Sequence, residues 1–120
     1  MAKKILIIDD SALMRRVISD IIKTNKQYEV ADFARDGLEG FDRIVSHPKM
    51  YDAIILDINM PKMNGLELLE MLQKNRLQET VIVVSTVAKE GAKETIKALE
   101  LGAFDFVTKP ENFIEAKGED

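Results

Sequence analysis

The feature that most constrains the fold is an alternation of short apolar runs with longer segments of helical periodicity. The runs are Lys4–Ile8, Tyr28–Ala34, Ala53–Leu56, Val81–Ser85 and Phe104–Thr108. Three of them are almost entirely Val, Ile and Leu, which is typical of strands in a parallel sheet buried on both faces. The second run is less apolar, so we expect it at an edge of the sheet.

Apolar residues recur at helical spacing in the segments between these runs. The four stripes are Leu13, Met14, Val17, Ile18, Ile21 and Ile22; Leu38, Phe41, Ile44 and Val45; Leu66, Leu69 and Leu72; and Ile96 and Leu99. Ser11 is expected to cap the first helix, and Gly102 to end the fourth. The alternation predicts one α/β domain over residues 1–120, with a doubly wound five-stranded parallel sheet between two layers of helices.

Composition excludes several classes of protein. The chain has no cysteine, which rules out disulfides, thiolate metal sites and a cysteine nucleophile. No apolar stretch approaches the roughly 18 residues of a membrane span, and the N-terminus lacks a signal-peptide core. We therefore expect a cytoplasmic protein without membrane contact. The net charge of −4 argues against a nucleic-acid surface on this domain.

Charged residues follow three of the apolar runs. Asp9 and Asp10 follow the first, Asp57 follows the third, and Lys109 follows the fifth. In an open parallel sheet, ligands bind beyond the carboxyl ends of the strands, so these side chains are expected at one edge. Clustered carboxylates repel one another unless a cation neutralises them, and oxygen ligands suit Mg²⁺. Asp57, on the middle strand, is the expected nucleophile for a phosphoryl group.

A hydroxyl residue at the same edge completes the predicted site. Ser85 ends the fourth run and Thr86 follows it, so either hydroxyl could donate to a phosphoryl oxygen. Taken alone, Ser85 could be an ordinary strand-end hydroxyl, Lys109 a solvated loop lysine and Asp57 the start of a turn. The pair Asp9-Asp10 could simply favour a helix start. The joint pattern favours a site, because all these residues lie at one edge with complementary charges.

The motifs around these residues resemble the receiver domains of two-component response regulators along nearly the whole chain. The matching segments are Ile7–Ser11, Leu56–Pro61, Met63–Gly65, Val83–Thr86 and Val107–Pro110. The resemblance implies a flavodoxin-like sheet with strand order 2-1-3-4-5. It also implies that the domain accepts a phosphoryl group from a histidine kinase. Segments 10–16 and 98–110 are most similar to the receivers of chemotaxis methylesterases.

The resemblance assigns roles around the metal. It implies that Asp10 and Asp57 bind Mg²⁺ directly, that the backbone carbonyl of Asn59 is a further ligand, and that Asp9 acts through a bound water. Asp57 would be the phosphoacceptor, and Lys109 would form an ion pair with the phosphoryl group. Unlike many methylesterase receivers, which have Glu there, this chain has Asn59 two residues after the acceptor.

The resemblance also implies a switch. Ser85 would hydrogen-bond the phosphoryl group and draw Thr86 and the following loop inward, and Phe106 would fill the vacated space. The change would alter a surface on the fourth helix and fifth strand that binds an unknown downstream partner or output domain. Asn59 and Val87 flank the route of attacking water and are expected to tune the lifetime of the acyl phosphate. A monomer, or a weak phosphorylation-dependent dimer, is expected.

Two further expectations concern what the chain lacks. There is no Gly-x-Ser-x-Gly elbow and His47 is the only histidine, so we expect no esterase activity, only the domain's own phosphorylation and dephosphorylation. Phe113 and Ile114 predict a fifth helix of at most about two turns. That is shorter than in the family, and we expect a truncated last helix and an absent output domain.

Three other functions compete with this interpretation. A magnesium-dependent phosphatase with an aspartyl nucleophile usually has a second acid two residues on, where this chain has Asn59. Flavin binding needs a phosphate loop after the first strand, and Asp9 and Asp10 would repel the phosphate. A phosphorylation-independent binding module is the third, and the complete set of site residues argues against it.

Overall fold

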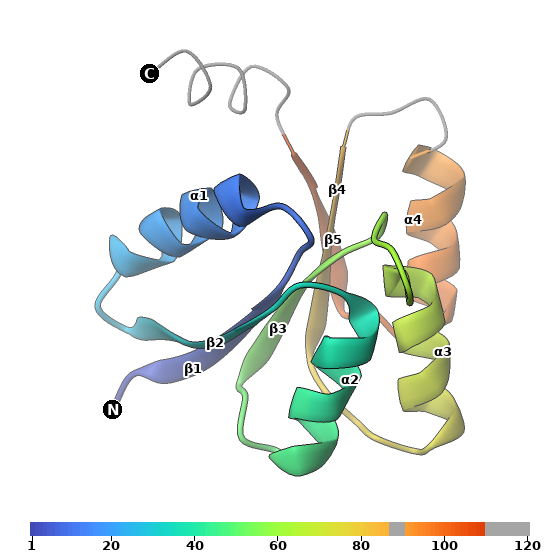
Figure 1. Ribbon diagram of the computed structural model, residues 1–120, viewed down its shortest axis with the longest axis horizontal. Helices are drawn as coiled ribbons and strands as arrows, with labels where there is room; N and C mark the ends of the chain where they lie inside the picture. Colours follow the sequence, from blue (N-terminus) through green and yellow to red (C-terminus); the bar gives the residue numbers. More distant parts are fainter. Residues whose placement is uncertain (87–90, 110–120) are drawn as a thin grey trace.

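The computed structural model describes residues 1–86 and 91–109, and its helices and strands alternate as predicted (Figure 1). The strands are β1 (Lys3–Ile8), β2 (Tyr28–Ala34), β3 (Ala53–Asp57), β4 (Val81–Thr86) and β5 (Asp105–Lys109). The helices are α1 (Ala12–Lys23), α2 (Gly37–Ser46), α3 (Gly65–Lys74) and α4 (Gly91–Glu100). The expected short fifth helix falls in residues 110–120, outside the described part of the chain.

The five strands form one parallel sheet in the order β2-β1-β3-β4-β5. Helix α1 covers one face, and α2, α3 and α4 lie together on the other (Figure 1). The predicted fold class and strand order are confirmed. Strand β2 lies on one side of β1 and β3 lies on the other, so the strand order reverses between β1 and β3. Such sheets bind ligands beyond the carboxyl ends of the strands at this reversal.

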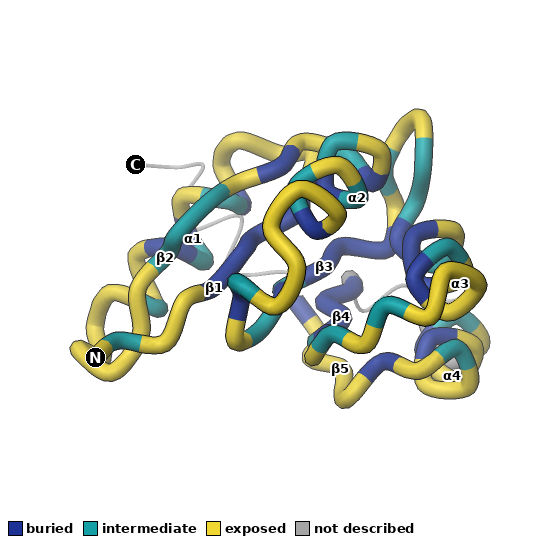
Figure 2. Tube along the Cα trace, turned by 90° about the horizontal axis from the view of Figure 1, so that it is seen from below, coloured by how far each residue is buried: buried dark blue, intermediate teal, exposed yellow. Residues whose placement is uncertain are grey.

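Burial follows the sheet order. Among the strands, the central β1, β3 and β4 hold most of the buried residues, whereas the two edge strands are largely half-exposed or exposed (Figure 2). The main core lies between the sheet and α2–α4, and its fully buried side chains include Leu6, Ile8, Ile44, Ile54, Leu56, Leu68 and Val83. No helix among the described residues is both long and apolar enough to cross a bilayer.

The predicted apolar stripe of α4 is wrong by one position. Ile96 and Leu99 are 58% and 41% exposed, whereas Thr95 and Ala98 face the core at 7% and 0%. Small side chains at the contact allow a helix to pack close to its neighbours, so the largest apolar residues need not mark the buried face. Several members of the other stripes are also exposed, namely Leu13, Ile21, Leu38 and Val45.

The helix ends agree with their sequences. The Ser11 hydroxyl accepts a hydrogen bond from the N–H of Met14 at 3.1 Å, which confirms the predicted cap of α1. Helix α3 begins with a capping box in which the side chains of Asn64 and Glu67 each accept from the other's backbone N–H. Gly102 has φ +105° just after α4, as expected for the residue that ends a helix.

Strand β2 lies at an edge of the sheet, as predicted. The N–H of Asp9 donates to the carbonyl of Ala34, so the backbone polar groups of Phe33, one residue earlier, point away from β1. The Phe33 N–H donates to Asp32 Oδ1 at 3.1 Å, and its carbonyl accepts from Arg43 Nε at 3.0 Å. Both outward groups of Phe33 are therefore already bonded within the chain.

Candidate functional site

The parallel sheet brings the predicted site residues to one edge. Ile8 of β1 lies beside Leu56 of β3, so the residues that follow them, Asp9 and Asp57, stand next to each other. On the other side of β3, Asp57 pairs with Val84 of β4. The strands therefore deliver two acids to the same point. Asp57 and Lys109 prove to be the last residues of β3 and β5 rather than the residues that follow those strands.

Three carboxylates form the centre of the site. Asp9, Asp10 and Asp57 each place a carboxylate oxygen within 4.8 Å of the others. Asp9 and Asp57 are buried, and Asp10 is exposed. The predicted clustering of the three acids at the sheet edge is thus what the structure shows. Such a cluster is unstable by itself, because like charges in a partly buried site repel strongly.

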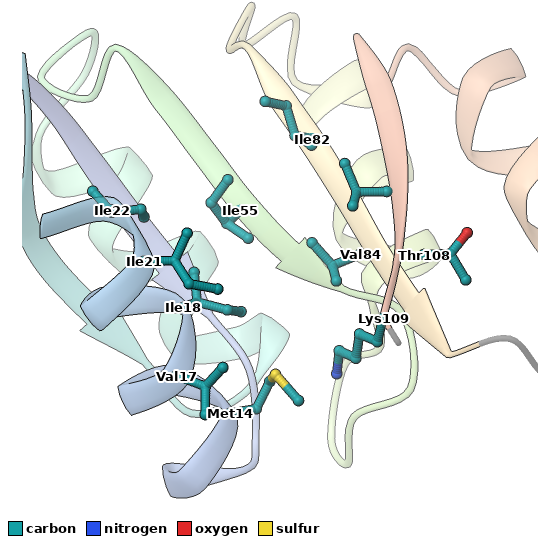
Figure 3. Close-up of a pocket in the computed structure, with 11 residues that line it drawn as sticks. Met14, Val17, Ile18, Ile21, Ile22, Ile55, Ile82, Val84, Thr108 and Lys109 are labelled. Carbon is teal, nitrogen blue, oxygen red and sulfur yellow. The ribbon is translucent and has the colours of Figure 1, made fainter. Parts of the chain in front are cut away.

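Lys109 provides the opposing charge. Its Nζ lies 3.0 Å from Asp9 Oδ2 and 3.2 Å from Asp57 Oδ1, and the side chain is buried. The stem of the lysine lies at the end of an apolar groove of about 300 Å³ between α1 and the sheet (Figure 3). The apolar surroundings exclude water from the stem and strengthen the ion pairs. One ammonium against three carboxylates leaves a formal charge of −2.

The environment of Asp57 disfavours its ionised form. Burial, and next the charge of Asp9, raise the pKa of Asp57 from 3.8 to about 6, although the ammonium of Lys109 acts in the opposite direction. The acid is therefore ionised at neutral pH, but at a cost in free energy. A cation bound between the carboxylates would remove that cost.

The carboxylates differ in how they are held. Asp9 accepts from the N–H of Ser11 at 2.9 Å through Oδ1 and from Lys109 through Oδ2. Asp57 accepts from Lys109 through Oδ1, and no described residue donates to its Oδ2. Asp9 is thus fixed at both oxygens, while Asp57 Oδ2 has no donor within residues 1–86 and 91–109. An available carboxylate oxygen beside a cation is the arrangement that a nucleophile requires.

The remaining predicted residues occupy separate positions. Ser85 is 7% exposed near the end of β4. Asn59 is exposed on the loop after β3. Thr86 is the last residue of β4, with its side chain outside the described part, and Val87 also lies outside it. Phe106 is 40% exposed on β5 and is therefore not part of the buried core.

Arg15 was missed by sequence reasoning. Its Nη1 donates to the backbone carbonyl of Asp9 at 2.7 Å and so ties α1 to the acidic loop. The contact spans six residues and depends on where α1 starts. The only signal in the sequence is an arginine in the first turn of a helix that follows an acidic strand end.

The donor set suits a hard divalent cation. It consists of carboxylate oxygen atoms, it carries a formal charge of −2 once the Lys109 ammonium is included, and its exposed member, Asp10, leaves one side open to water or to phosphate oxygens. Mg²⁺ keeps several such ligands in most protein sites, so a partly open cluster fits it better than a closed cage would.

Comparisons with known proteins confirm the resemblance to receiver domains. Residues 5–117 match the family model of the response regulator receiver domain. A protein-glutamate methylesterase/protein-glutamine glutaminase of Pyrococcus horikoshii is 45% identical over 111 residues, which cover 92% of this chain and 29% of that protein. The chain spans less than a third of the curated relatives with which it was compared.

Solved structures are similar over almost the whole chain. The response regulator domain of Thermotoga maritima CheB is 40% identical with a TM-score of 0.83, covering 99% of this chain and 90% of that one. A CheX–CheY–BeF3–Mg²⁺ complex from Borrelia burgdorferi contains a chain that is 28% identical with a TM-score of 0.81, covering 97% and 84%.

Proposed function

Because the chain belongs to the response regulator receiver domain family, we propose that Asp57 is its phosphoacceptor and that transfer to Asp57 requires Mg²⁺. The observation that carries this proposal is the arrangement of Asp57, which has one oxygen bound to Lys109 and the other unbonded among the described residues. The domain is a phosphoacceptor signalling domain, and we assign its reaction to Asp57.

The chain's own residues account for most of the transfer. Asp57 Oδ2 attacks the phosphorus, an O–P bond forms, and the P–N bond of a phosphohistidine donor breaks, so that the imidazole leaves with the electron pair. Mg²⁺, when bound, would supply positive charge that stabilises the transferring oxygens. Asp9, Asp10, Asp57 and the carbonyl of Asn59 would hold it. Esterification of Oδ2 removes the charge of the Asp57 carboxylate, so Lys109, which is bound to Oδ1, is released and pairs with the phosphoryl oxygens.

The hydroxyl of Ser85 would donate a hydrogen bond to the product and start the switch. Ser85 is buried near the end of β4. Phe106 of β5 pairs with Val83 of β4, two residues before Ser85. A half-exposed aromatic can move inward at small cost when space opens. The exposed apolar residues Ile96 and Phe104 lie near it in sequence, on α4 and just after it. We assign the output surface to this face of α4 and β5.

The partners follow from the family. The phosphodonor would be a histidine kinase, and the downstream partner would act in chemotaxis, because the relatives above include methylesterase receivers and a CheY complex. The aligned region is a receiver, so we propose that this domain has no esterase activity of its own. The cytoplasmic location, and the monomeric or weakly dimeric state expected from the sequence, stay predictions. Asn59 and Val87 are proposed to set the acyl-phosphate lifetime.

Incubation with acetyl phosphate and Mg²⁺ tests the reaction. Intact mass spectrometry should show the addition of one phosphoryl group, lost in Asp57→Asn and on chelation of Mg²⁺. Asp42→Asn is the matched control, because Asp42 is an exposed aspartate away from the site. Full labelling of Asp57→Asn would refute the assignment. Sustained turnover of a phosphomonoester would instead identify a phosphatase. Partner binding that is unchanged in Asp57→Asn would identify a phosphorylation-independent binding module.

A further inference from the structure

The loop of residues 58–64 joins β3 to α3 and is fastened at both its base and its tip. At the base, the N–H of Gly65 donates to the carbonyl of Ile58 at 2.8 Å. At the tip, the N–H of Met63 donates to the carbonyl of Pro61 at 2.7 Å, and the carbonyl of Met63 accepts from the N–H of Gly37 at 2.9 Å. The loop that carries Asn59 is therefore attached to the first residues of two helices, α2 and α3.

The two glycines make contacts that no other residue could make. A Cβ on Gly65 would lie 2.4 Å from the carbonyl oxygen of Asp57 and 2.9 Å from Ile58 Cα. A Cβ on Gly37 would lie 2.3 Å from the carbonyl oxygen of Met63. In both cases the obstructing atom belongs to the backbone, so it cannot rotate away. Only a shift of the loop, or of the end of β3 that carries Asp57, would make room for a Cβ.

We propose that Gly37 and Gly65 are positioning residues for the metal site. They hold the loop against α2 and α3 and so set where the carbonyl of Asn59 stands relative to the carboxylate of Asp57. The inference rests on the proposed function, since it takes Asn59 and Asp57 as ligands of Mg²⁺. Octahedral coordination by Mg²⁺ tolerates little displacement of a ligand, which is why a backbone fixed at three points suits it.

Gly40 provides a control within the same helix. A Cβ there would lie 2.5 Å from Cδ1 of Ile8, which is the flexible end of a side chain. Its N–H donates to the carbonyl of Asp36 inside α2 and has no contact with the loop. Gly40→Ala should therefore disturb packing on α2 without moving the metal ligands, whereas Gly37→Ala should move the loop.

The first experiment measures Mg²⁺ affinity in three variants. Titration is followed through the amide NMR signals of residues 9–11, which report folded molecules only, and thermal unfolding is recorded in parallel. Gly65→Ala and Gly37→Ala should weaken Mg²⁺ binding by about tenfold or more. Gly40→Ala should keep the wild-type affinity within about twofold, even if its melting temperature falls. Equal affinities in Gly37→Ala and Gly40→Ala would overturn the inference.

The second experiment needs no variant and stands even if a substitution prevents folding. Mg²⁺ that binds the loop should slow hydrogen exchange of the Gly37 and Gly65 amides, which donate to it, and leave the Gly40 amide unchanged. If the site signals titrate with Mg²⁺ but exchange at Gly37 and Gly65 is unchanged, the role of the two glycines is contradicted and the proposed function is not. If the wild-type site signals fail to titrate, the proposed function itself is wrong.

Discussion

Replacing Asp57 by asparagine should stabilise the fold in the absence of Mg²⁺. Burial and the neighbouring Asp9 charge raise the pKa of Asp57 from 3.8 to about 6. Between these values the folded chain binds more protons than the unfolded chain, so the free energy of unfolding falls as pH rises through that window. Asparagine has nearly the shape of the neutral acid and never ionises, and the variant therefore escapes this loss.

The size of the effect follows from the shift in pKa. A displacement from 3.8 to about 6, at about 1.4 kcal/mol per unit, gives a destabilisation of about 3 kcal/mol once both states are ionised, near pH 7.5. Around pH 5 only part of the cost is present, about 1.5 kcal/mol. Loss of the contact between Lys109 and Asp57 is already contained in this difference, since the ammonium lowers the pKa that burial raises.

Urea unfolding in a chelating buffer at these two pH values provides the assay. The free energy of unfolding of Asp57→Asn should be clearly higher than that of wild type near pH 7.5, and the difference should be about half as large around pH 5. Asp42→Asn, at an exposed position, should match wild type at both. Saturating Mg²⁺ should raise the stability of wild type far more than that of Asp57→Asn. A variant less stable than wild type near pH 7.5, or a gap that widens on acidification, would refute the reasoning.

Three other substitutions test local features, each by urea unfolding. Lys62 has φ +67°, so Lys62→Gly should raise stability by about 0.5–1 kcal/mol, and a loss would show that its side chain makes a compensating contact. Asn64→Ala removes half of the capping box and should cost about 1 kcal/mol, whereas no loss would mean that water caps α3 equally well. Tyr51→Phe deletes the hydroxyl that donates to Asp32 at 3.0 Å and should cost about 1 kcal/mol, and an unchanged midpoint would argue that this bond adds nothing.

The strand pattern and the acidic cluster could be predicted because each depends on a local signal. Runs of Val, Ile and Leu mark buried parallel strands, and the parallel arrangement then forces Asp9, Asp57 and Lys109 to one edge. No contact between distant side chains has to be known in advance. This is why the alternation of strands and helices and the grouping of the acids agree with the structure, whereas the strand order was implied only by the resemblance to receiver domains.

The details that could not be predicted depend on packing distances. Whether α4 faces the core through Ile96 or through Ala98 depends on how closely the helix approaches the sheet, which periodicity alone does not contain. The edge position of Lys109 could be predicted, but its two ion pairs could not, because the carboxylates that it joins lie 100 and 52 residues away in the chain. The contacts of Gly37 and Gly65 also arise only when the loop and the helices are placed together in space.

The bonded edge of β2 has a consequence for how the domain behaves in crowded solution. An open strand edge offers unpaired backbone groups on which a second molecule can polymerise. At Phe33 those groups are taken by a carboxylate and a guanidinium of the same chain. A second strand would have to displace both Asp32 and Arg43 before it could join. At this point of the β2 edge, strand addition therefore meets a barrier built from two side chains that take no part in phosphoryl transfer.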